Sequence, residues 1–171
     1  MEKMTSAYAN KVIKKLQDDK AFLLNIESEG YLYVAAIDED PVIPEYDYKQ
    51  ISDEIAVIDQ KILKIKHAIN IINATSEIDV DGEKMTIDQI LVSMAQLNNR
   101  RKTLDRMRKE QPKKRIDSNS WVSRKSAPEY QYVNYDIDMV KKDYEAIDSK
   151  IAKMQMALDK FNQTVVFDVE F

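Results

Sequence analysis

The chain has 171 residues, with 26 basic and 30 acidic side chains and a formal net charge of −4. This length suits one domain, so we expect residues 1–171 to form a single domain. The lack of cysteine excludes disulfides, thiolate zinc sites and iron–sulfur clusters. No apolar run approaches the roughly 20 residues of a membrane-spanning helix. The N-terminus has no signal-peptide core, so the sequence predicts a cytoplasmic protein.

Four helical stretches are predicted between the glycines and prolines of the chain. The first runs from about Thr5 to Glu27 and has the weakest apolar pattern. The second has isoleucines spaced alternately by four and three residues, which are the a and d positions of a heptad repeat. This isoleucine seam consists of Ile51, Ile55, Ile58, Ile62, Ile65, Ile69 and Ile72. Because the other positions are mostly polar, one face of this helix should be buried.

The third and fourth helices are predicted in the second half of the chain. Thr86 and Gln89 have the spacing of a capping box, so the third helix should begin there and end before Pro112. The fourth helix begins near Asp136, and an apolar seam continues without a gap from Ile137 to Phe161.

The connections between these helices are rich in residues that favour strands. Asp81 and Gly82 tolerate positive φ, which predicts a β-hairpin between residues 78–80 and 83–85. Further short strands are expected at Tyr31–Val34, Tyr130–Val133 and Thr164–Val169.

An internal repeat relates the two halves of the chain. Ile72-Asn-Ala-Thr75 matches Phe161-Asn-Gln-Thr164 at an offset of 89 residues, and the isoleucine seam maps onto the fourth helix at the same offset. The sequence therefore predicts duplication of an α–β–α–β unit, with pseudo-repeat halves at about 1–85 and 86–171. The expected fold is α+β and mostly α: an antiparallel four-helix bundle of coiled-coil hairpins with short β-hairpins.

Candidate metal and catalytic residues are few. Asp79 and Asp81 partly match a calcium-binding loop, but a hairpin turn explains the same residues better. His67 is the only histidine, and it falls on the polar side of its helix without an acid–base partner near it in sequence. The sequence therefore predicts no catalytic residue, no metal site and no cofactor, and a protein that is not an enzyme.

Two blocks of opposite charge stand out. Residues 100–115 hold nine basic and two acidic side chains, whereas residues 38–59 hold eight acidic side chains and one lysine. Helix dipoles and solvation explain such runs without a function. Alternatively, the basic block binds nucleic-acid phosphates, or the two blocks pair between subunits. The residues predicted to contact an anion or a partner are Arg100, Arg101, Arg106, Arg108, Lys113, Lys114, Arg115 and Trp121.

Short motifs in the stretches 72–104 and 121–164 occur in a characteristic order. They are Ile72-Asn-Ala-Thr75, Asp81-Gly82, Thr86-Ile-Asp88, Leu104-Asp-Arg106, Tyr135-Asp-Ile137 and Asn162-x-Thr164. In this order and spacing the chain resembles the septicolysin-like family of small bacterial proteins. The resemblance implies paired helices with small β elements. The family label refers to a thiol-activated cytolysin, and without cysteine the thiol part cannot apply to this chain.

The function that these patterns favour is a non-enzymatic, self-associating helical scaffold or interaction protein. Burial of the heptad seams would drive formation of a homo-oligomer, and the charge blocks would set its register. One alternative is a membrane-active, pore-forming protein, suggested only by the family label. The other is a nucleic-acid-binding protein that uses residues 100–115, although the net negative charge argues against that partner.

Overall fold

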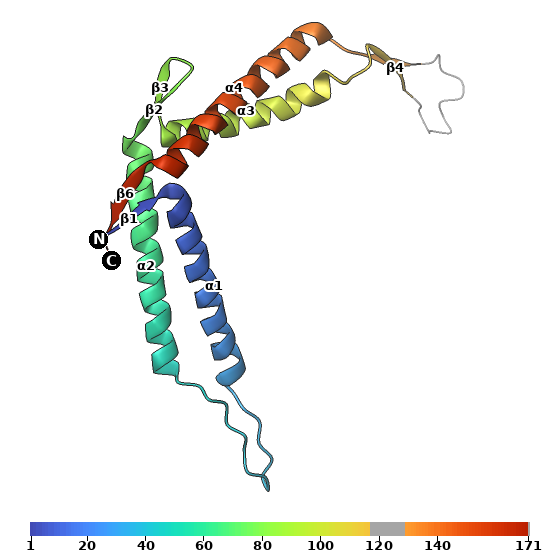
Figure 1. Cartoon of the computed structure of the whole chain (residues 1–171). Helices are drawn as coiled ribbons and strands as arrows, with labels where there is room; N and C mark the ends of the chain where they lie inside the picture. Colours follow the sequence, from blue (N-terminus) through green and yellow to red (C-terminus); the bar gives the residue numbers. More distant parts are fainter. Residues whose placement is uncertain (117–128, 171) are drawn as a thin grey trace. The chain divides into compact units, whose positions relative to one another are not determined.

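The computed structural model describes residues 1–116 and 129–170, and the chain forms two compact units (Figure 1). The first unit is Met1–Ile78 with Leu158–Phe171, and the second is Asp79–Ala157. The described elements are β1 (Glu2–Thr5), α1 (Ser6–Gly30), α2 (Tyr48–Thr75), β2 (Glu77–Val80), β3 (Glu83–Thr86), α3 (Ile87–Met107), β4 (Lys113–Arg115), β5 (Tyr130–Tyr132), α4 (Ile137–Thr164) and β6 (Val166–Val169). These helices and short antiparallel strand pairs confirm an α+β fold that is mostly α.

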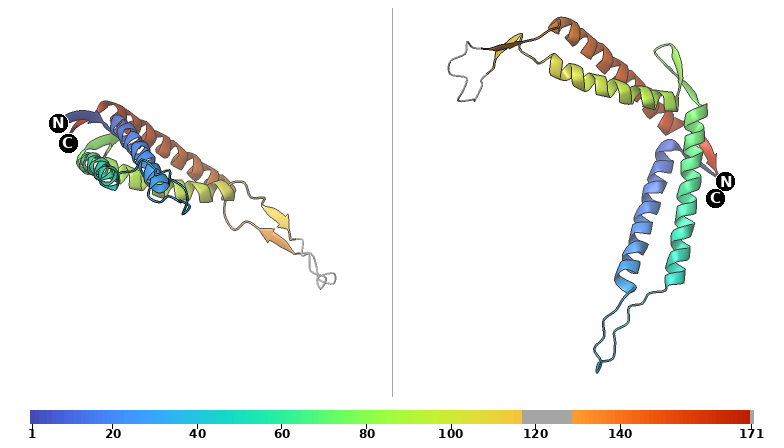
Figure 2. Two further views of the ribbon diagram at one scale, coloured as in Figure 1. Left: turned by 90° about the horizontal axis from the view of Figure 1, so that it is seen from below. Right: turned by 180° about the vertical axis from the view of Figure 1, so that it is seen from behind.

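The first unit is a helical hairpin with a two-stranded ribbon at one end. In both views of Figure 2, α1 and α2 lie side by side, joined by the loop 31–47. β1 pairs antiparallel with β6, from Glu2 opposite Val169 to Thr5 opposite Val166, so the chain ends meet. The ribbon packs on the helices through a core of Met4, Ala9, Ile13, Ile65, Phe167 and Val169.

The isoleucine seam of α2 lies on the inner face of this hairpin, as its spacing predicts. Ile51 and Ile65 are 7% and 0% exposed, and the other five seam residues are partly buried. A two-helix hairpin covers each helix along one side only, so most of the seam keeps contact with solvent.

The second unit is built on a hairpin of α3 and α4, which run in opposite directions (Figure 1). Ile87, Ile90 and Leu104 of α3 are buried, as are Val140, Ile151 and Met154 of α4. β2 and β3 pair through a turn in which Asp81 and Gly82 have φ of 61° and 87°. The predicted Asp-Gly hairpin is therefore confirmed.

Side-chain caps lie at the start of all four described helices, and Thr5 caps α1 by accepting from the Tyr8 amide at 3.2 Å. The Asp47 carboxylate accepts a hydrogen bond from the Gln50 amide at 3.0 Å, and α2 starts there. The capping box of α3 is present, with the Thr86 amide donating to Gln89 Oε1 at 3.0 Å. Asp136 accepts from the first amides of α4 in the same way. Each cap satisfies amides that have no partner within the helix.

The strands differ from the sequence expectation in two ways. The predicted strand Tyr31–Val34 is wrong, because these residues lie in an exposed loop with no paired strand. Conversely, β1 and β4 were not predicted, because they pair with β6 and β5, which for β1 is a partner far away in the sequence. A segment that favours the extended conformation becomes a strand only when another segment lies beside it and pairs with it.

Among the described helices, none combines the length and the apolar character that a crossing of the lipid bilayer requires.

Candidate functional site

The loop 31–47, which we call the acidic loop, joins α1 to α2. It carries five carboxylates and no basic side chain. Apart from Pro44 and Tyr46, all of its residues are exposed, and Val34 and Ile37 are 98% and 102% exposed. The exposed large apolar side chains of the loop are Tyr31, Leu32, Tyr33, Val34, Ile37, Val42 and Ile43. The acidic loop therefore exposes apolar side chains as well as carboxylates.

The base of the acidic loop is held by Tyr46. The Tyr46 hydroxyl donates a hydrogen bond of 3.1 Å to Oε1 of Glu27, which lies in the last turn of α1. Partial burial, together with this hydrogen bond, raises the pKa of the Tyr46 phenol and keeps it a donor. Gly30 makes the approach possible, since a Cβ there would lie 2.7 Å from the Cβ of Tyr46. The adjoining groove is lined by Leu24, Glu27, Ser28, Tyr31, Tyr46 and Tyr48.

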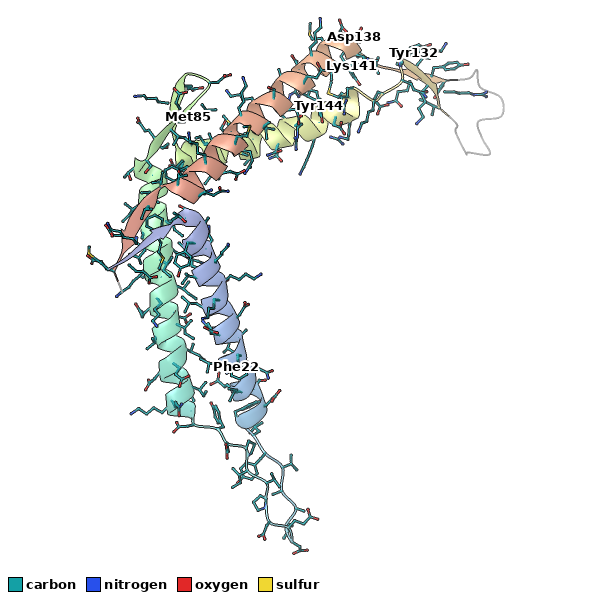
Figure 3. All side chains as sticks on the ribbon, in the orientation of Figure 1. Phe22, Met85, Tyr132, Asp138, Lys141 and Tyr144 are labelled. Carbon is teal, nitrogen blue, oxygen red and sulfur yellow. The ribbon has the colours of Figure 1, made fainter. Side chains whose placement is uncertain are left out.

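β4 and β5 form a second exposed surface, which we call the basic ribbon. Lys113 stands opposite Tyr132 and Arg115 opposite Tyr130, so these four side chains share one face. The Lys113 ammonium lies 4.1 Å from the Tyr130 ring centroid and 5.5 Å from that of Tyr132, which projects from the ribbon in Figure 3. All residues of both strands are exposed. The ribbon thus presents a cationic and aromatic face to solvent.

Two of the predicted contact residues are engaged within the second unit. Arg101 of α3 forms an ion pair with Asp148 of α4, with 2.5 Å between Nη1 and Oδ1. Arg108 pairs with Asp105 at 2.7 Å and stacks 4.0 Å from the ring centroid of Tyr144. Through Asp148 and Tyr144, these two guanidinium groups link the end of α3 to α4. Sequence reasoning placed Tyr144 in the apolar seam of its helix and gave no signal of this stacking.

The remaining predicted contact residues divide into two sets. Arg100 and Arg106 are exposed on α3. The three basic residues of β4 are brought together on the basic ribbon by their pairing with β5. Trp121 lies outside the described residues. The structure therefore brings three exposed basic residues together on the ribbon.

The carboxylates of the partial calcium motif make contacts at the turn of the β2–β3 hairpin. Asp79 accepts a hydrogen bond from the Gly82 amide at 3.1 Å, and Asp81 pairs with Lys153 of α4 at 2.7 Å. Among the described residues, no three side chains of the metal-ligating types come together. His67 is exposed on α2.

Comparisons with known proteins inform the fold. No protein-family description and no curated protein matches the chain. The chain is similar to the crystal structure of a functionally unknown conserved protein from Corynebacterium diphtheriae, with a TM-score of 0.63 and 17% identity. The alignment covers 98% of this chain and 100% of that one. At this identity the likeness shows a shared fold alone.

Proposed function

We propose that the protein is a non-enzymatic scaffold that assembles with further copies of itself. The observation that carries this proposal is the apolar surface that the helical hairpins leave uncovered. Besides the half-covered isoleucine seam, α2 exposes Val57, Leu63 and Ile71 at 53%, 60% and 51%. Burial of such surface against another copy is favourable because it removes apolar area from water.

The charges of the chain support a second copy as the partner. The acidic loop and the basic ribbon of one chain carry opposite charges, so a second copy offers each surface its complement. The antiparallel four-helix bundle expected from the sequence would then be completed by hairpins of two copies.

A duplication within the chain also supports self-association. β1 and β3 have the same sequence, Glu-Lys-Met-Thr, and both lead directly into a helix. We infer a repeat of β–α–α–β, comprising β1–α1–α2–β2 and β3–α3–α4–β6. The first strand of each repeat pairs with the last strand of the other, since β1 pairs with β6 and β3 with β2. Fusion of two copies that once associated as a symmetric dimer would produce this pairing.

Light scattering of the purified chain tests the proposal. At micromolar concentration we expect a mass at least twice the 19.9 kDa of one chain. Leu63→Asp and Val57→Asp should each raise the dissociation constant about tenfold or more, because a charge would enter an apolar interface. Lys61→Asp, at an exposed polar position of the same helix, is the matched control. A monomeric mass at these concentrations would contradict the proposal.

A second candidate function is nucleic-acid binding, favoured by the cationic and aromatic face of the basic ribbon. It predicts salt-dependent retention of the protein on RNA or DNA, which Lys113→Glu with Lys114→Glu would remove. No retention at low salt would exclude it. We also propose that the septicolysin-like resemblance reflects common ancestry, which the solved structure of a member of that family would test.

A further inference from the structure

The segment Tyr31–Val34 of the acidic loop has a strand-forming sequence but no strand partner. Its residues, Tyr-Leu-Tyr-Val, are types that favour a pleated conformation. All four side chains are exposed. In the loop as described, the backbone hydrogen bonds are those of the Tyr31 amide with Glu27 O, of the Glu39 amide with Ala36 O and of the Ile51 amide with Asp47 O. The amides and carbonyls of residues 32–34 take part in none of these bonds.

The basic ribbon is a two-stranded sheet. Among the described residues, β4 and β5 pair with each other and with no third strand. Each strand of a two-stranded ribbon keeps one unpaired edge, which is a template for a further strand. A two-stranded ribbon is also marginally stable by itself, so an added strand would strengthen it.

Charge and side-chain pattern match the segment to the ribbon. The acidic loop carries only negative charge, and β4 consists of three basic residues. In an extended strand Tyr31 and Tyr33 project to one side, as Tyr130 and Tyr132 do from β5. A strand added beside β5 in the register that puts Tyr31 and Tyr33 on the face of Tyr130 and Tyr132 would form two aromatic pairs, and cross-strand aromatic contacts are favourable.

Resting on the proposed self-association, we propose that Tyr31–Val34 of one copy adds as a third strand to the basic ribbon of another copy. Among the described strand pairs, none joins this segment to β4 or β5, and we assign its partner strand to a second copy because the proposed function supplies one. Main-chain hydrogen bonds supply the attachment, and the opposite charges select the partner and speed the encounter.

Charge reversal on the two surfaces tests the inference by light scattering and sedimentation. Asp38→Lys with Asp40→Lys makes the acidic loop more basic, and Lys113→Glu with Lys114→Glu makes the ribbon more acidic. Each double variant alone should associate about tenfold or more weakly at low salt, because the charge of one of the two surfaces is then largely neutralised or reversed. A mixture of the two should recover association, since the unaltered loop of the ribbon variant can pair with the unaltered ribbon of the loop variant.

Matched control variants reverse exposed charges in the middle of α1. Asp18→Lys with Asp19→Lys, and Lys14→Glu with Lys15→Glu, make the same changes in net charge at exposed positions. These controls should associate like the wild-type chain, and mixing them should change nothing. If they weaken association as much as the loop and ribbon variants do, net charge rather than the docking site is responsible and the inference is wrong.

Proline substitution tests the strand itself. Leu32→Pro with Val34→Pro removes two amide donors, and it should weaken association about tenfold or more. Val42→Pro is the matched control, because Pro41 and Pro44 already keep that limb of the loop out of a ladder.

The outcomes separate this inference from the proposed function. An oligomeric wild-type chain whose association none of the loop and ribbon variants weakens would overturn strand addition while leaving self-association intact. Ribbon variants that lose binding to RNA but keep full association would also overturn it. A wild-type chain that is monomeric throughout the micromolar range would overturn the proposed function together with the inference. Mutual rescue in the mixture, with unchanged controls, is the result expected.

Discussion

The α1–α2 and α3–α4 hairpins share one plan but end in different ways. Each hairpin is preceded by a strand of identical sequence, Glu-Lys-Met-Thr. Each is also followed by a short strand, which is β2 after α2 and β6 after α4. One hairpin ends in an exposed acidic loop, and the other ends in a basic ribbon. The two helical hairpins are thus alike in plan, whereas their connections differ in charge and in strand pairing.

The two ends are also fastened differently. The acidic loop is held at its base, where Tyr46 bonds to Glu27 and packs on Gly30. The basic ribbon has strand pairing of its own, and below it the Tyr135 hydroxyl donates to Met107 O at 2.8 Å. We therefore expect the ribbon to be the more rigid of the two surfaces, which suits it to receive an extended segment.

The largest expected effect tests whether the two hairpins depend on equivalent core positions. Ile65 and Met154 correspond at the repeat offset, and both are 0% exposed. Ile65→Ala and Met154→Ala should each lower the free energy of unfolding by about 2–5 kcal/mol, because each leaves a cavity. Denaturant unfolding provides the measurement, with the exposed Lys64→Ala as control, expected within about 0.5 kcal/mol. A loss at only one of the two positions would break the equivalence.

A smaller effect distinguishes packing from backbone conformation. Gly30→Ala would push a Cβ into Tyr46 and should destabilise the first hairpin by about 1–3 kcal/mol. Gly82→Ala meets no atom within 4 Å but has φ of 87°, so its cost of about 1–2 kcal/mol would be conformational. In the first variant the NMR signals of Tyr46 should shift, and in the second those of the β2–β3 hairpin. A neutral Gly30→Ala would show that Tyr46 does not pack closely there.

The smallest effect concerns an exposed ion pair of the second hairpin. Hydrogen bonds from Lys109 and Arg108 lower the pKa of Asp105 below its ordinary value. Since the folded pKa is the lower one, the stabilisation is present above the ordinary pKa and is lost as pH falls through the folded value. Carboxyl NMR titration should show this low pKa, and Lys109→Gln or high salt should raise it. An ordinary pKa in the wild-type chain would contradict the contact.

The sequence alone determined the elements whose signals are local. The seam of α2, the capping box of α3 and the Asp81–Gly82 turn all act between residues a few positions apart, so their periodicity and turn chemistry could be interpreted directly. Glu-Lys-Met-Thr occurs at residues 2–5 and again at 83–86, and this recurrence is a sequence pattern that supports the proposed duplication.

Only the tertiary structure decided which strands form and which charges remain accessible. Tyr31–Val34 has the stronger β preference, yet β4 is the strand, because β4 has β5 beside it. Likewise, Arg108 and Arg101 looked equivalent to the lysines of β4 in sequence, but Tyr144, Asp105 and Asp148 engage them. Both outcomes depend on contacts between residues far apart in the chain, which no local pattern records.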